Sequence, residues 1–238
     1  MKPRLLLVIF LVMSASSFAA IMTVSPIAPV VDGADISQLF GLDDLGPGAI
    51  AGPIGHVWSN RPVHGQSFTT GANAGGYELS AITMLARVDG ALGTTSPQWD
   101  IRVGTIDSTP NLSVLVTEIA TGVNIPNTGG TTNPQWVTWQ FDTPIHLNPN
   151  TLYGFDVDSS GQGFISLNNT AAPYAGGTAF SSGSGGVPMN PLTLHNGFDG
   201  FDRVFHADLV AVPEPSTYAL FALVLLAGAG YIRRKRSL

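Results

Sequence analysis

The acidic stretch DVDSSG, residues 156–161, has the residue types and the spacing of a cation-binding loop. Asp156, Asp158 and Ser160 place oxygen ligands at positions 1, 3 and 5, and a glycine follows at position 6, as at the start of a calcium loop. The bidentate glutamate expected at position 12 is absent, because that position is Leu167. Calcium is therefore the one cofactor that we consider for this sequence.

A second pair of carboxylates, Asp199 and Asp202 in the stretch GFDGFD, could complete such a site from elsewhere in the fold. The alternative interpretation is that carboxylates at the end of a hairpin are solvated turn residues, which is their more common role. Both interpretations stay open at the level of the sequence.

Two tryptophans end almost identical heptapeptides, GTTSPQW at residues 93–99 and GTTNPQW at residues 130–136. A flat indole ring is a suitable platform for the apolar face of a sugar ring. Strand alternation places Trp99 toward the core and Trp136 on the opposite, outer side, which makes Trp136 the candidate platform for a glycan. The alternative is that the repeat reflects shared turn chemistry, in which a proline opens each strand.

No enzyme motif occurs in the sequence. It lacks a G-x-S-x-G elbow, an H-E-x-x-H helix and a glycine-rich phosphate loop. Nothing in the sequence brings together Glu78 and Glu118, although a glycosidase needs two carboxylates in one cleft. His206 lies beside Phe205 on a predicted strand, where a structural role is expected. We therefore expect a protein that is not an enzyme and has no catalytic residues.

The charge of the chain is divided unevenly between its ends and its body. Of 238 residues, the body from Ala20 to Pro213 holds four arginines, no lysine and 15 acidic residues, a net charge of −11. This charge argues against nucleic acid as a partner, because phosphates require a basic surface. The absence of cysteine excludes disulfides, thiolate metal sites and a cysteine nucleophile.

Alternation of apolar and polar residues predicts strands throughout the body. The clearest cases are 99–103, 137–141 and 153–157. Further strand candidates are residues 66–70, 79–88, 112–119, 164–168 and 204–210. We therefore expect an all-β fold, a single β-sandwich (jelly-roll-like) domain over residues 61–212, preceded by an N-terminal extension over residues 20–60 that is partly loop.

Residues 1–19 have the three parts of a secretory signal peptide. Lys2 and Arg4 form the basic start, residues 5–13 are apolar, and small residues precede a cleavage site for signal peptidase after Ala19. The apolar run is shorter than the roughly 20 residues that span a bilayer. A permanent N-terminal anchor is the alternative interpretation.

Residues 217–232 are uncharged and largely apolar, which predicts a C-terminal transmembrane helix. A basic cluster follows and would keep this end in the cytoplasm; its members are Arg233, Arg234, Lys235 and Arg236. The alternative is a buried core helix, but four consecutive charges continue poorly into a core.

Pro213, Glu214 and Pro215 precede this helix and the basic cluster. The three parts together, residues 213–238, resemble the PEP-CTERM sorting signal of Gram-negative bacteria. The resemblance implies an exosortase, a membrane protease or transpeptidase that cuts near the Pro-Glu-Pro, in bacteria that make exopolysaccharide. The two prolines keep the motif extended and outside the helix, where a protease can reach it.

These features together predict an exported, non-catalytic β-sandwich that is held transiently in the inner membrane. It would then reach the cell surface, the outer envelope or the extracellular matrix. Its expected partners are signal peptidase, the exosortase and exopolysaccharide. A matrix-modifying glycan hydrolase and a self-assembling structural protein are the two alternatives.

Overall fold

The structure, a computed structural model, describes residues 19–39, 64–87, 98–106, 112–121, 125, 135–159, 165–166, 168–169, 174–181 and 202–214. These residues form strands, turns and bends and contain no helix, so the predicted all-β class is confirmed. None of them belongs to a helix long and apolar enough to cross a membrane. The predicted transmembrane helix at 217–232, the basic cluster and almost all of the predicted signal peptide lie outside the described residues.

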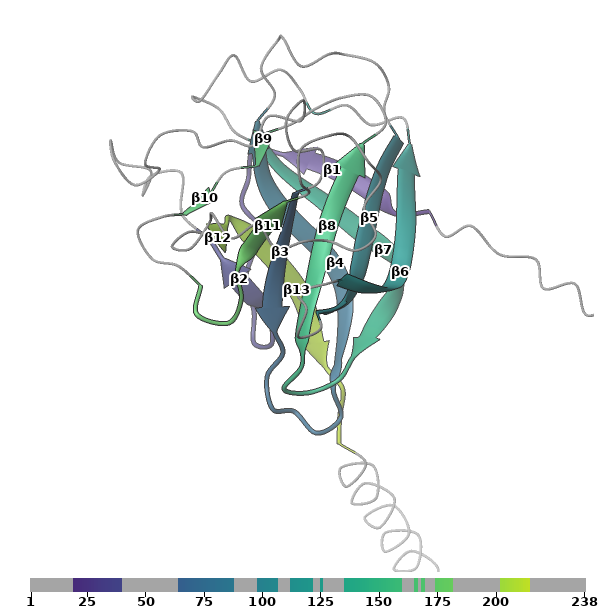
Figure 1. Ribbon diagram of the computed structural model, residues 1–238, viewed down its shortest axis with the longest axis vertical. Coiled ribbons are helices and arrows are strands. Elements are labelled where there is room, and N and C mark those ends of the chain that lie inside the picture. The colour runs from purple at the N-terminus through teal and green to yellow at the C-terminus, as the bar shows by residue number, and fades with distance from the viewer. Residues whose placement is uncertain are drawn as a thin grey trace, which may run out of the picture.

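Two antiparallel sheets form the body (Figure 1). Sheet A contains, in spatial order, β1 (Ile21–Ser25), β7 (Gln135–Leu147), β4 (Tyr77–Arg87), β13 (Phe205–Ala211) and β2 (Ile36–Gln38), and β9 (Ile165–Ser166) pairs with the end of β4. Sheet B contains β11 (Ala179–Ser181), β3 (His64–Thr69), β8 (Leu152–Ser159), β5 (Gln98–Ile106) and β6 (Leu112–Thr121). The short strands β10 (Asn168–Asn169) and β12 (Asp202–Arg203) pair with each other.

The core lies between the two sheets. Residues at every second position of the central strands are buried, as period-two alternation predicts. They include Trp99, Ile101 and Val103 on β5, Val137, Trp139 and Phe141 on β7, and Tyr153, Phe155 and Val157 on β8. The sandwich-like arrangement thus follows from the pattern of apolar residues.

Aromatic rings join the two sheets across the core. Trp99 of sheet B meets Trp139 of sheet A edge to face, with ring centroids 6.3 Å apart. Phe155 of sheet B and Phe205 of sheet A are 5.8 Å apart. Such pairs contribute about 0.5–1.5 kcal/mol each beyond the burial of their apolar area. They also fix how one sheet is placed over the other.

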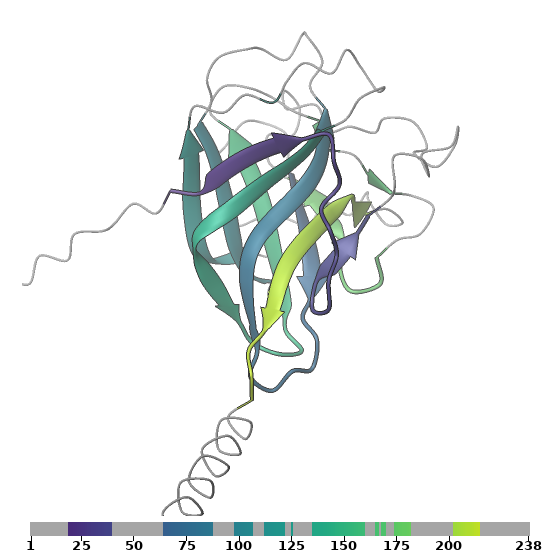
Figure 2. The ribbon, with the colours of Figure 1, turned by 180° about the vertical axis from the view of Figure 1, so that it is seen from behind.

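The predicted boundary between an extension and the domain at residue 60 is wrong. β1 pairs with β7 along its whole length, and β2 pairs with β13, so both strands are integral to sheet A (Figure 2). Ala20 and Met22 are buried in the core. These strands were hard to predict because each has only a few residues, too short a run for alternation to be recognised.

The strand directions give the sandwich two different ends. At the tail-side end, where β13 finishes, β3 connects to β4 through residues 70–76 and β7 connects to β8 through residues 148–151. At the opposite, far end, β4 and β6 end, and β5 and β7 begin. Both heptapeptides of the sequence repeat therefore lead into strands at the far end.

We expect Trp139→Ala to destabilise the fold by about 3–5 kcal/mol, because it leaves a large cavity between the sheets. Trp139→Phe should cost much less. It keeps an aromatic ring, and the indole N–H that it removes has no hydrogen-bond partner among the described residues. Urea unfolding followed by circular dichroism measures both, and equal losses for the two variants would contradict this account of the core.

Candidate functional site

The last strand of the body continues directly into the segment that resembles a sorting signal. Ala211 pairs with Tyr77 of β4, and the next residue is held by a turn. The Val212 N–H donates to the Gly76 carbonyl at 3.0 Å. The Asn73 amide, through Nδ2, donates to the Val212 carbonyl at 2.8 Å and to the Gly76 carbonyl at 2.6 Å. Both polar backbone groups of Val212 are therefore engaged by the body.

The turn that holds Val212 is itself closed by hydrogen bonds. The Gly76 N–H donates to the Asn73 carbonyl at 2.9 Å, and the Asn73 N–H donates to the Tyr77 hydroxyl at 3.1 Å. Gly76 has a φ of 76°, in the left-handed region that glycine adopts without strain. At Gly75 a Cβ would lie 2.3 Å from the Val212 carbonyl oxygen, so the close approach of the turn to the end of β13 requires glycine there.

The neighbouring turn between β7 and β8 is locked to the same end. Thr70 Oγ1 donates to the Asn148 carbonyl at 2.7 Å and accepts from the Thr151 N–H at 3.0 Å. The Asn150 N–H donates to the Gly71 carbonyl at 2.8 Å, and Asn150 takes the left-handed φ of 49° that asparagine tolerates. The tail-side end is thus a set of mutually bonded turns.

The predicted sorting motif begins where this end stops. Pro213 and Glu214 are exposed and follow Val212 without a linker. Pro215 and the basic cluster of residues 233–236 lie outside the described residues. The structure therefore places the start of the motif against the folded body.

Comparison with protein families finds a match to the PEP-CTERM protein-sorting motif over residues 211–236. This chain carries a PEP-CTERM protein-sorting motif. The matched segment starts inside β13, because Ala211 is the last residue of that strand. Searches among curated proteins and among solved structures return no match for the chain.

A PEP-CTERM motif implies an exosortase as the processing partner. It also implies export, with membrane-anchored transit before a surface or extracellular location. The resemblance that the sequence predicted from Pro213, Glu214 and Pro215 is thereby confirmed.

The structure contradicts the predicted role of Asp156 as the first ligand of a calcium loop. Asp156 lies within β8, not at the start of a loop, and its side chain is fully buried. Arg102 on the adjacent strand β5 engages both carboxylate oxygens, with Nε to Oδ1 at 2.9 Å and Nη2 to Oδ2. A bidentate arginine pair satisfies the carboxylate that calcium would need.

Only some of the remaining predicted ligands lie among the described residues. Asp158 is in β8, while Ser160 and Asp199 lie outside the described residues. Among the residues that are described, no cluster of His, Asp and Glu could hold a metal ion. Asp202 is buried and accepts from Gln66 Nε2 at 2.8 Å and from the Tyr174 N–H at 2.6 Å. Desolvation by burial raises the pKa of Asp202, and these hydrogen bonds only partly offset it.

The prediction that Trp136 presents an open ring to a glycan is wrong, because Trp136 is only 1 % exposed. Alternation places it on the side opposite Val137, as expected, but this side is covered. Trp136 packs there with Leu85 and Val204, and Leu39 beside β2 adds to the cluster. The outer surface of sheet A thus has a small apolar cluster of its own, which strand alternation cannot predict.

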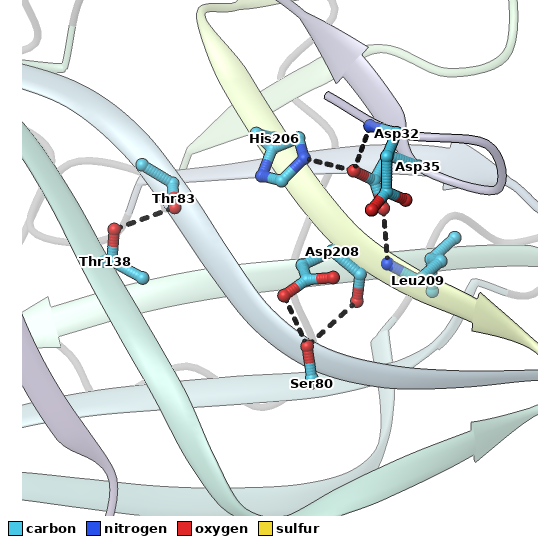
Figure 3. A network of polar contacts seen from close by, with 8 residues as sticks. All are labelled: Asp32, Asp35, Ser80, Thr83, Thr138, His206, Asp208 and Leu209. Atoms are coloured by element: carbon cyan, nitrogen blue, oxygen red, sulfur yellow. Dashed lines mark hydrogen bonds and ion pairs between the residues drawn. The ribbon is translucent and has the colours of Figure 1, made fainter. Parts of the chain in front are cut away.

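Asp35 is a structural carboxylate that the sequence alone did not single out (Figure 3). It accepts hydrogen bonds from the Asp32 N–H at 2.9 Å, the Leu209 N–H at 2.8 Å and His206 Nε2 at 2.9 Å. β2 pairs only with Phe205–Ala207 of β13. Beyond this ladder, the Asp35 carboxylate accepts the hydrogen bond from the Leu209 N–H. His206 is therefore a structural histidine, as predicted.

These contacts set the protonation of Asp35. Burial by itself would raise the pKa of this carboxyl group, but the two backbone hydrogen bonds and the bond to His206 outweigh it and lower the pKa. The spacing D-x-x-D at residues 32–35 is a sequence signal of this turn. It does not indicate that the carboxylate bonds to His206 and Leu209 of β13.

The two glutamates of the body have separate partners. Glu78 lies beside His146 on the neighbouring strand, with Oε1 3.0 Å from Nδ1. Glu118 is buried at the edge of sheet B and accepts from the Asp142 N–H of β7 at 3.1 Å. Burial raises the pKa of Glu118, the Asp142 N–H lowers it in part, and the Asp142 charge raises it further.

We expect Asp35→Asn to destabilise the protein by about 1–3 kcal/mol at pH 7, because it removes charge-assisted hydrogen bonds to buried donors. A lowered carboxyl pKa contributes stability above the unfolded value of about 3.9, and this contribution is lost as the pH falls through the folded pKa. Urea midpoints from pH 7 to pH 3 should therefore converge for the variant and the wild type.

Thr83→Val is the matched control for this experiment. It removes the neutral hydrogen bond between Thr83 Oγ1 and Thr138 Oγ1 on the same surface (Figure 3). Its cost should not change with pH. A loss in Asp35→Asn that is equally independent of pH would contradict the role assigned to the carboxylate.

We expect Glu118→Gln to stabilise the protein at pH 7 to 8, on the order of 1 kcal/mol. A raised carboxyl pKa means that stability is lost as the pH rises through the folded pKa, and the neutral amide avoids this loss while still accepting from the Asp142 N–H. Thermal melts at pH 8 and pH 4 measure the effect, which should vanish at the lower pH. A variant less stable than the wild type at pH 8 would contradict the prediction.

Proposed function

We propose that this protein is exported, processed at its C-terminus by an exosortase and released to act at the cell surface or in the exopolysaccharide matrix as a non-catalytic β-sandwich. The observation that supports this most is the PEP-CTERM motif at residues 211–236, which follows the body without a linker. The signal peptide at residues 1–19, the transmembrane helix at 217–232 and the cytoplasmic basic cluster belong to the same proposal. Their order along the chain gives one consistent orientation, with the acidic body outside.

We infer that the strands of the sandwich are connected in the order of a jelly roll. Eight strands lie in two layers, β2-β13-β4-β7 and β3-β8-β5-β6. Along the chain, successive strands of this set alternate between the two layers. The exception is the β5–β6 hairpin, whose two strands lie in the same layer. Two Greek keys of this kind are the usual route by which an eight-stranded double sheet closes.

The position of the tail gives the body a direction. β13 ends at the tail-side end, so anchored protein holds this end toward the membrane and the far end away from it. Strands β4 and β6 end, and β5 and β7 begin, at the far end. The segments that connect the strands of a sandwich commonly carry recognition, which makes the far end the expected contact surface for matrix components.

The proposed role in binding exopolysaccharide rests on the PEP-CTERM motif, whose resemblance implies bacteria that make exopolysaccharide. It does not rest on Trp136, because the ring of Trp136 is buried. The two alternatives are a hydrolase and a self-assembling structural protein. Hydrolysis of host exopolysaccharide by the purified body would favour the first. Concentration-dependent light scattering of the body without the tail would favour the second.

The sorting step is tested by replacing the motif in its native host. We expect wild-type protein to lose residues 1–19 and a C-terminal segment, whereas Pro213→Ala/Glu214→Ala/Pro215→Ala should stay in the membrane fraction at several times the wild-type level. Ser216→Ala is the control, because it changes the adjacent residue and leaves the motif intact. Intact mass spectrometry of both fractions measures the termini.

Two outcomes would contradict the proposal. Full-length protein dissolved in the cytosol would exclude export. Unchanged processing of the triple variant, or of the wild type in a host whose exosortase is inactivated, would exclude that enzyme.

A further inference from the structure

The geometry points to the turn Asn73–Gly76 as the element that sets where the sorting segment can be cut. The bond that is cut lies C-terminal to Val212, and β13 remains whole in the mature protein. This inference deepens the proposed function and depends on it for the identity of the enzyme. The first position at which the chain can be cut depends only on the contacts of the tail-side end.

Proteases commonly bind their substrates as extended strands, through the backbone N–H and C=O groups near the bond that is cut. At Val212 both groups are already used, by the Gly76 carbonyl and by the Asn73 amide. Ala211 is paired with Tyr77 in the sheet. Cleavage at or before Val212 therefore requires that these bonds first open.

A cut inside β13 would also damage sheet A. β13 pairs with β4 on one side and with β2 on the other, so it is an interior strand. Its residues Phe205, Ala207 and Leu209 are buried in the core. Stability of the released body therefore requires that processing leave this strand intact.

The chain changes character immediately after Val212. Pro213 and Glu214 are exposed, and proline has no N–H with which to join a ladder. The Asn73 amide holds the Val212 carbonyl, and Gly75 of the same turn lies close to the carbonyl oxygens of Val212 and Pro213. The backbone is thus held by hydrogen bonds at least through Val212, and cleavage without opening of the turn requires a bond C-terminal to this residue.

Limited proteolysis of the full chain in detergent micelles tests this boundary without the exosortase. Proteinase K, which has broad specificity, is added at low concentration, and the C-termini of the fragments are identified by mass spectrometry. We expect the first wild-type cuts in the tail to lie C-terminal to Val212, with no early cut between Leu209 and Val212.

Two variants open the turn by different physical means. Asn73→Ala removes both Nδ2 hydrogen bonds, and Gly75→Ala places a Cβ against the Val212 carbonyl oxygen. Each should speed cleavage between Leu209 and Val212 by roughly tenfold or more, because cleavage follows the population of the locally opened state. Thr70→Val is the matched control, since it loses hydrogen bonds at the same end without contacting Val212.

Early wild-type cuts between Leu209 and Val212 would overturn the inference. The same holds if Thr70→Val opens this segment as much as Asn73→Ala does. Should both turn variants fail to fold, the wild-type cutting pattern still decides. In the native host, a mature C-terminus at Ala211 or earlier would overturn it as well, whereas unprocessed protein would overturn the proposed function and leave the proteolysis result standing.

Discussion

Strand β13 is an interior strand of sheet A, and its last residue leads without a linker into the sorting motif. This one constraint ties the fold to the membrane. Because β4 and β2 flank β13, the strand cannot leave the sheet without exposing core residues such as Phe205. The tail is therefore fixed to a strand that is part of the core, and the turn around Asn73 closes the junction.

The polar contacts of the body serve mainly to join segments that are distant in sequence. Asp35 ties the segment before β2 to β13, Arg102 pairs with Asp156 between β5 and β8, and Asp202 bonds to Gln66 of β3. Each carboxylate is buried, and each has its hydrogen bonds satisfied by the chain itself. Acidic residues in a strongly acidic chain can thus be structural, and their number alone is a poor guide to metal binding.

The two ends of the sandwich differ in the contacts that they make. The tail-side end consists of turns bonded to one another and to Val212, and it faces the membrane in the anchored protein that we propose. At the far end, β4 and β6 end, and β5 and β7 begin. In the function that we propose, sorting and contact with matrix components therefore involve opposite ends of the sandwich.

Alternation and a linear motif are local properties of a chain, so the all-β class, the inward residues of β5, β7 and β8 and the PEP-CTERM motif could all be predicted from the order of residues. Three features could be learned only from the folded protein: Trp136 is buried, Asp156 forms an ion pair with Arg102, and β1 and β2 are part of sheet A. The reason is physical: burial and ion pairing depend on which strands become neighbours, and strands such as β4 and β13 are far apart in the sequence. Whether a residue is exposed, paired or free is set by those neighbours.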